Sequence, residues 1–174
     1  MTTAVPTVAA AELRTALRGH ASGVAVLTAA TPSGPAGVTI TSFTSVSAEP
    51  ALVSFALAET SSTWARVKDC ERFGIQLLGA GQREVAERFA ATGVDRFAPP
   101  TRWHTGPHGV PLLDDCAAWL VGTRHHQLTL GDHELIVCAV EHVRVGSPGG
   151  GLVHLHGSLH AAPGSPESLG SRER

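Results

Sequence analysis

Residues 37–50 read GVTITSFTSVSAEP, and six of the eleven residues from Gly37 to Ser47 carry a hydroxyl group. Threonine and β-branched residues favour a β-strand, and Glu49-Pro50 breaks it. A strand that leads hydroxyl and free backbone N–H groups into a turn can bind a phosphate without lysine. The same backbone can hydrogen-bond a flat heteroaromatic ring. The alternative is a threonine-rich strand with an ordinary turn, and composition alone does not separate the two.

Further strand-like segments lie on both sides of this stretch and are separated by turns rich in glycine and proline. We expect strands at residues 24–27, 36–44, 51–57, 73–78, 117–128, 134–145 and 152–159. Short helices are expected at residues 11–18, 64–68 and 82–91. The pattern predicts a mostly β fold, an antiparallel barrel with helices added to it.

The length of 174 residues fits a single domain. We expect a flexible leader at residues 1–10, the domain at residues 11–161 and a flexible tail at residues 162–174, where proline, glycine, serine and charge predominate. Residues 92–111 form a long connection, and such a loop in a compact domain is more often functional than idle.

Charge and cysteine usage exclude several classes of protein. The chain has 13 basic and 15 acidic residues, and Lys68 is its only lysine, so nucleic acid is not an expected partner. No apolar stretch reaches the roughly 20 residues that span a bilayer, and the first residues do not resemble a signal peptide. Cys70, Cys116 and Cys138 are widely spaced, which favours reduced thiols in a cytoplasmic protein.

Familiar catalytic signatures are missing from the sequence. There is no GxGxxG, phosphate-binding loop, GxSxG or HExxH motif, which argues against a dinucleotide-binding dehydrogenase and an α/β-hydrolase. Ten histidines raise the possibility of a metal site. His154 and His156 are expected on one face of a strand and His125 and His126 are adjacent, but few acidic residues lie near either pair. Histidines in solvent or in hydrogen bonds are therefore the favoured interpretation.

Three more short segments carry groups that bind anions or cofactors. Residues 61–63, Ser-Ser-Thr, precede a helix and can act as its N-cap, as a phosphate site, or as both. Arg96, between Asp95 and Phe97, suits bidentate phosphate binding, although a surface ion pair with Asp95 is an equal alternative. His133 ends a Gly-Asp-His turn, where a lone histidine usually has no special role.

Taken in order, these segments resemble the flavin reductase family, the small reductase partners of two-component flavin monooxygenases. The matching segments are residues 22–28, 37–47, 61–63, 73–78 with Phe89, 95–97 and 131–133, and the resemblance extends from about Leu13 to Ala161. It implies a split β-barrel of antiparallel, Greek-key-like strands with two or three flanking helices. Thr41 and Gln76 stand where serine and asparagine are common in the family, and Thr41 keeps the hydroxyl.

The resemblance also implies a site. Residues 37–47 are called the opening motif. The ring and ribityl chain of the flavin would lie along seven of its residues, namely Thr39, Ile40, Thr41, Ser42, Ser45, Val46 and Ser47. The flavin phosphate would be held by Ser61, Ser62 and Thr63, with Arg96 beside Phe97 as the charged partner. His133 would lie near the nicotinamide, where it would position the ring or act electrostatically.

The expected activity is hydride transfer from NADH or NADPH to FMN or FAD, which needs no catalytic triad because the two cofactor rings supply the chemistry. The resemblance implies a homodimer and a monooxygenase that receives the reduced flavin. Three alternatives remain open at this point: a split-barrel flavin enzyme that acts on another small substrate, a non-catalytic flavin- or haem-binding protein, and a metal-binding β-barrel.

Overall fold

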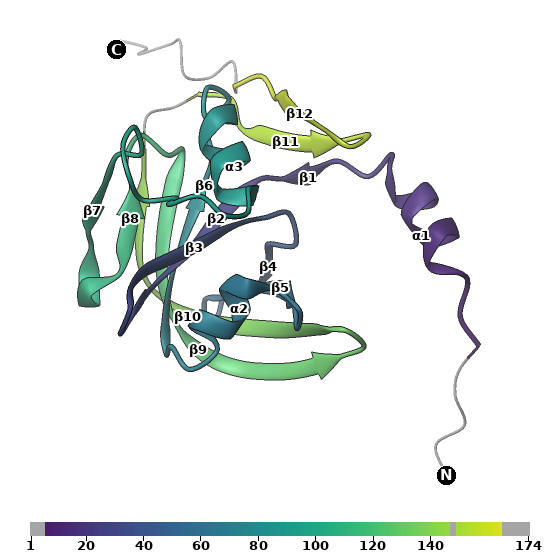
Figure 1. Cartoon of the computed structure of the whole chain (residues 1–174), viewed down its shortest axis with the longest axis horizontal. Coiled ribbons are helices and arrows are strands. Elements are labelled where there is room, and N and C mark those ends of the chain that lie inside the picture. The colour runs from purple at the N-terminus through teal and green to yellow at the C-terminus, as the bar shows by residue number, and fades with distance from the viewer. Residues whose placement is uncertain (1–5, 147–148, 165–174) are drawn as a thin grey trace, which may run out of the picture.

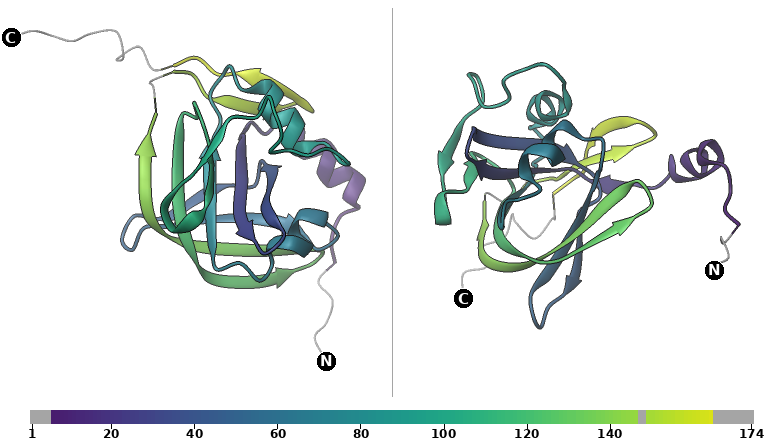
Figure 2. Two further views of the ribbon diagram at one scale, coloured as in Figure 1. Left: turned by 60° about the vertical axis from the view of Figure 1, so that its left-hand side comes forward. Right: turned by 60° about the horizontal axis from the view of Figure 1, so that its bottom comes forward.

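Antiparallel β-strands dominate the computed structural model, which describes residues 6–146 and 149–164 (Figure 1). The largest sheet has seven strands in the order β3-β2-β6-β9-β10-β5-β4, and all its neighbouring strands are antiparallel. These strands are β2 (Ala25–Thr31), β3 (Gly34–Ile40), β4 (Thr44–Ser47), β5 (Leu52–Ala58), β6 (Arg72–Leu77), β9 (Ala118–Leu130) and β10 (His133–Val145). The sheet curls round a common core (Figure 2).

Two small sheets and three α-helices complete the fold. The small sheets are formed by β1 (Ser22–Gly23), β11 (Leu152–Leu155) and β12 (Ser158–Ala161), and by β7 (Trp103–Thr105) and β8 (Pro111–Leu113). The helices are α1 (Ala10–Leu17), α2 (Ser62–Val67) and α3 (Arg83–Ala90), and a short 3₁₀ turn covers Pro107–Gly109. This arrangement confirms the expected antiparallel split-barrel class with flanking helices.

Alternate residues of β2 are buried on both faces of the sheet, which fixes the positions of α2 and α3. Leu27 belongs to the core inside the curled sheet, together with Trp64 of α2. Val26 belongs to a second cluster, together with Phe89 of α3. Successive strand residues point to opposite faces, so α2 and α3 pack on different clusters and both contact β3. The site described below lies where β3 meets these helices.

The structure corrects two of the expected strands and adds detail to the expected loop. The strand predicted at residues 36–44 ends at Ile40, and Thr44–Ser47 forms a separate edge strand. The strand predicted at residues 152–159 is a hairpin, because the chain turns at His156 and Gly157, which both have positive φ. The connection predicted at residues 92–111, which left room for a short helix, contains the 3₁₀ turn and also β7, a strand that was not expected. Short strands closed by such turns carry too little apolar periodicity to be recognised.

The first helix stands away from the rest of the chain (Figure 1). Leu13 and Leu17 share one face of it, as expected, but half or more of each side chain is exposed and no residue of α1 is buried. Among the residues described, no helix is long and apolar enough to cross a bilayer. Parts of the expected leader and tail, residues 1–5 and 165–174, lie outside the described residues.

Candidate functional site

A cavity of about 610 Å³ opens between the start of β3, the first turn of α2 and the loop after α3. Six of the residues around it carry the argument that follows: Gly37, Ser62, Thr63, Arg66, Arg96 and Trp103. Sites for small molecules and cofactors typically enclose about 300–1,000 Å³. The cavity is therefore large enough for a ligand of that size.

The first turn of α2 presents one hydroxyl to this cavity and uses two others to build the wall. The Ser61 hydroxyl accepts a hydrogen bond from the backbone N–H of Trp64 at 3.3 Å, so Ser61 is the N-cap of the helix. Trp64 is buried in the core and anchors the turn. Thr63 is only 4% exposed, whereas Ser62 is exposed on the cavity side. Ser62 is thus the hydroxyl left free for a ligand.

Arg96 ties the loop after α3 to both β3 and α2. Its Nε and Nη2 donate to the carbonyl of Ala91 at 3.2 and 2.7 Å. Its Nη1 donates to the carbonyl of Gly37 and, at 2.9 Å, to the hydroxyl of Thr63. The ion pair with Asp95 that the sequence left open is not formed, because Asp95 Oδ1 accepts the N–H groups of Phe97 and Ala98 instead.

Two guanidinium groups give the cavity wall its positive charge. Arg66 lies on the same face of α2 as Ser62, one turn further on, and donates to the carbonyl of Pro35 at 3.1 Å. The pKa of Arg96 is lowered by burial and then by the nearby charge of Arg66. Like charges held close together on one wall favour an anionic ligand, since the anion relieves their repulsion.

Aromatic contacts fix the loop that roofs the cavity. Phe97 packs edge-to-face against Phe89 of α3 on one side and Trp103 of β7 on the other, with ring centroids 5.2 and 5.4 Å apart. The indole N–H of Trp103 also donates to the carbonyl of Phe97 at 3.1 Å. These contacts hold the backbone of Arg96 in place next to the aromatic cluster.

The opening motif contributes to the scaffold around the cavity more than to its wall. The Thr39 hydroxyl donates to the carbonyl of Ala86 in α3 at 2.7 Å, and the Ile40 side chain is buried in the core. The Ser42 hydroxyl donates to the carbonyl of Ala56 at 2.9 Å and accepts from its N–H at 3.0 Å, so Ser42 bridges to β5. Four further members of the predicted set, Thr41, Ser45, Val46 and Ser47, lie exposed or half-buried before and along the edge strand β4.

His133 is the first residue of β10 and pairs with Ala58 of β5. Ala58 in turn lies four residues before the start of α2. Its Nδ1 lies 2.7 Å from Asp132 Oδ1, and this hydrogen bond keeps the pKa of Asp132 below its usual range. The Asp132 carbonyl accepts the N–H of Glu59, which ties the turn to the segment that leads into α2. The imidazole is about half exposed and does not line the cavity.

The cavity therefore unites Ser62, Thr63, Arg96 and Phe97 of the predicted set, but not the opening motif beyond Gly37 and not His133. Arg66 and Trp103, which also line the cavity, were not among the predicted site residues. The four-residue spacing of Ser62 and Arg66 on one helix face was the signal for Arg66. No sequence signal indicated Trp103, because its position depends on β7, a strand that was not predicted.

The histidines considered as metal ligands do not assemble into a site. His154 lies in β11, but His156 lies in the turn that follows, so the two do not share a strand face as predicted. The rings of His125 and His126 contact each other edge-to-face, 4.4 Å apart. Within residues 6–146 and 149–164, neither pair belongs to a group of three potential ligands.

Comparison with known proteins finds relatives that match most of the chain. Residues 17–163 match the family model described as flavin reductase like domain. The NADH:FMN oxidoreductase of Rhodococcus qingshengii is 41% identical over 136 residues, which are 78% of this chain and 71% of that protein.

Two solved structures share the fold. The NADH:FAD oxidoreductase of Streptomyces globisporus, in complex with NAD and FAD fragments, has a TM-score of 0.83 at 28% identity, covering 94% of this chain and 99% of the other. The styrene monooxygenase flavin reductase of Pseudomonas putida has a TM-score of 0.79 at 28% identity, covering 87% and 97%. With the family model matching well over half of its length, the chain belongs to the flavin reductase family.

Proposed function

We propose that this protein is an NAD(P)H-dependent flavin reductase that supplies reduced FMN or FAD to a separate monooxygenase. The observation that carries the proposal is the cavity of about 610 Å³ with Ser62, Arg66 and Arg96 on its wall, in a chain of the flavin reductase family. When flavin is bound, its N5 would accept a hydride from C4 of the nicotinamide. The chain's own residues bind, orient and shield the two rings.

The phosphate of the flavin is assigned to the Ser62 side of the cavity. The exposed Ser62 hydroxyl and the Arg66 guanidinium lie on one face of α2, and Arg96 adds positive charge from the opposite loop. Arg96 has most of its N–H groups committed to Ala91, Gly37 and Thr63, so its main task is to hold the wall in shape. Arg66 and Ser62 are then the groups that meet the phosphate.

The flavin ring is assigned to the edge of the barrel, along Thr39 to Ser42 and Ser45 to Ser47. Ser42 and Thr39 hold this edge by hydrogen bonds to β5 and α3, which leaves backbone groups at the break between β3 and β4 for the ring. His133 would position the nicotinamide from the neighbouring turn. Its hydrogen bond to Asp132 fixes the imidazole for that task.

A homodimer belongs to the proposal. Helix α1 buries none of its residues against its own chain, and Leu13 and Leu17 are half exposed. Leu128 and Leu130, near the tip of the β9–β10 hairpin, are also half exposed. A second copy covering these surfaces would remove them from water. We place the protein in the cytoplasm, where Cys70, Cys116 and Cys138, which are all free, stay reduced.

Comparing FMN with riboflavin tests the phosphate assignment. Riboflavin lacks the phosphate, so fluorescence titration should show tighter binding of FMN in the wild type. Arg66→Gln should reduce this preference, because it removes the charge and keeps a hydrogen-bonding side chain, whereas the exposed Arg14→Gln on α1 should leave it unchanged. Equal binding of FMN and riboflavin by the wild type would refute the assignment.

A further inference from the structure

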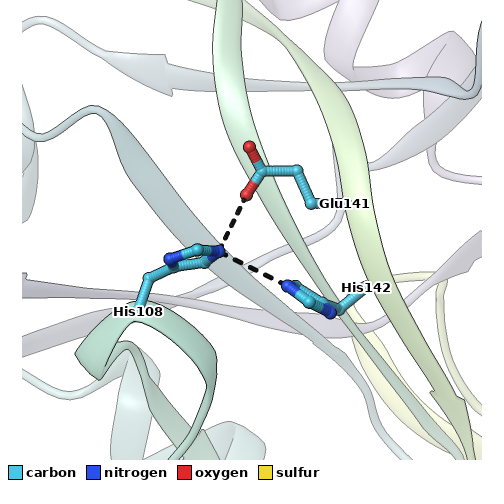
Figure 3. A group of neighbouring side chains, drawn as sticks. All are labelled: His108, Glu141 and His142. Carbon is cyan, nitrogen blue, oxygen red and sulfur yellow. Dashed lines mark hydrogen bonds and ion pairs between the residues drawn. The ribbon is translucent and has the colours of Figure 1, made fainter.

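Three side chains from two distant parts of the chain converge at a point on the molecular surface (Figure 3). His108 lies in the 3₁₀ turn between β7 and β8, and Glu141 and His142 are neighbours in β10. The Nε2 atom of His108 is 3.4 Å from Glu141 Oε2 and 3.4 Å from His142 Nε2. Within the described residues, this is the group of three potential metal ligands that the fold brings together.

Two irregular features of the backbone produce this convergence. Val140 pairs with Gly122 and His142 with Val121, so Glu141 is the extra residue of a β-bulge. In a regular strand Glu141 and His142 would point to opposite faces, whereas here both reach His108. His108 itself has a φ of 56°, in the left-handed region that few residues other than glycine adopt. Bulges and left-handed residues of this kind are common at functional sites.

Two of the three distances between the ligand atoms match the edge of a coordination tetrahedron, and all three atoms lie within 4.8 Å of one another. A zinc ion bound at about 2.0–2.1 Å to each ligand separates tetrahedral ligand atoms by about 3.3–3.4 Å. Both distances from His108 Nε2 have this value. We propose that His108, Glu141 and His142 bind a divalent transition-metal ion of the zinc class, with the fourth position open to water.

A hydrogen-bond network alone accounts less well for the geometry. One imidazole nitrogen carries at most one proton, so His108 Nε2 cannot donate to both Glu141 and His142. A single cation satisfies all three ligands at once. Thr123 donates to the other carboxylate oxygen, Glu141 Oε1, at 2.6 Å, which orients the carboxylate as an outer-shell partner of a metal ligand does.

Arg72 works against a cation at this position. Its Nε lies 3.5 Å from Glu141 Oε2, the same oxygen that faces His108. In the absence of metal, this carboxylate oxygen lies within 3.5 Å of both Arg72 Nε and His108 Nε2, and these two contacts keep the three side chains together. Replacing Arg72 by a neutral residue should therefore strengthen metal binding, which an ordinary ion-pair cluster would not predict.

The position of the site suggests what the metal does. It joins the tip of the β7–β8 hairpin to β10, and the other end of that hairpin carries Trp103, which lines the candidate flavin cavity. A bound ion would hold the hairpin on the sheet as a removable crosslink. Metal should therefore raise the melting temperature, and this effect is separate from flavin reduction.

Cobalt(II) absorption on tag-free, chelator-treated protein tests the proposal, because tetrahedral cobalt gives visible bands. We expect one cobalt ion per chain, displaced by zinc, and a higher melting temperature with zinc. His108→Ala and His142→Ala should each abolish the bands, and Thr123→Val should weaken binding roughly tenfold or more. Arg72→Gln should bind more tightly than the wild type.

The matched control is His125→Ala with His126→Ala, which removes two other adjacent surface histidines and should retain binding. Glu141→Gln keeps the size and the hydrogen-bonding capacity of the side chain but should lose most of the affinity. Absence of tetrahedral cobalt bands in the wild type would overturn the proposal. Undiminished binding in a folded His108→Ala/His142→Ala variant, judged by its circular dichroism, would overturn it as well.

Discussion

The Nη1 atom of Arg96 donates a hydrogen bond to the hydroxyl of Thr63 at 2.9 Å. This contact joins the loop after α3 to the first turn of α2, and both residues line the candidate flavin cavity. Thr63 is buried and structurally engaged, while its neighbour Ser62 is exposed. Two adjacent hydroxyl residues that looked equivalent in the sequence thus have different roles, and they can be separated by mutation.

Ser62→Ala should weaken FMN binding with almost no change in melting temperature, because Ser62 is exposed and its hydroxyl makes no hydrogen bond to the described residues. Thr63→Val should weaken FMN binding and also lower the melting temperature, because it removes one of the two hydrogen bonds of the partly buried Arg96 Nη1. Fluorescence titration and thermal unfolding of both variants measure the two effects. A fall in melting temperature for Ser62→Ala, with unchanged FMN affinity, would reverse the assignment.

His133→Ala should raise the Michaelis constant for NADH and leave FMN affinity nearly unchanged. The proposal places His133 on the nicotinamide side, and the side chain does not line the cavity assigned to the flavin phosphate. Steady-state kinetics at saturating FMN give the Michaelis constant, and titration without NADH gives the FMN affinity. His125→Ala, another exposed histidine of the same hairpin, serves as the control. A loss confined to FMN affinity would contradict the placement.

Gly37→Ala should destabilise the protein by about 1–3 kcal/mol, because there is no room for a methyl group. A Cβ at this position would lie 2.8 Å from Phe89 Cε1 and 2.9 Å from the carbonyl oxygen of Leu27. Chemical denaturation measures the change in the free energy of unfolding. Gly23→Ala is the matched control, since a Cβ there meets nothing within 4 Å. Equal stability of the two variants would show that β3 can move away from α3.

The free energy of unfolding should fall as the pH rises above about 9. Burial raises the pKa of Cys116 from 9.0 to about 11 and that of Cys138 from 9.0 to about 12. Between these values the unfolded thiols lose protons that the folded protein retains, so the unfolded state gains stability, by about 1 kcal/mol per thiol at pH 10. Denaturation from pH 8 to 10.5 measures the slope. A Cys116→Ala/Cys138→Ala variant should have a shallower slope, and an identical slope would exclude the thiols as its cause.

The sequence predicted the class of fold because the relevant signals are local. The paired strands have long apolar or alternating patterns, and Pro32-Ser33 and Gly131-Asp132 occupy the turns of two hairpins. Three residues of the cavity wall, Ser62, Thr63 and Arg96, were also named from the sequence, since they are of types that bind anions. That they bind the flavin phosphate stays a prediction.

What the sequence could not predict depends on tertiary contacts. The commitment of Arg96 to Ala91, Gly37 and Thr63 requires three segments to be packed together. The meeting of His108 with Glu141 and His142 depends on a β-bulge and a left-handed residue, neither of which has a signature in the residue pattern. The histidines that were considered instead, His154 and His156, are close in sequence, but His154 lies in β11 and His156 in the turn that follows it.

The central claim is that free flavin is reduced by NADH or NADPH on this protein. The most direct measurement is NADH or NADPH oxidation with FMN or FAD in large excess over enzyme, followed at the nicotinamide absorbance under anaerobic conditions. We predict many turnovers per active site, with reduced flavin accumulating in proportion to the flavin added. Oxidation that stops after one equivalent per site, or no oxidation with either nucleotide, would contradict the claim.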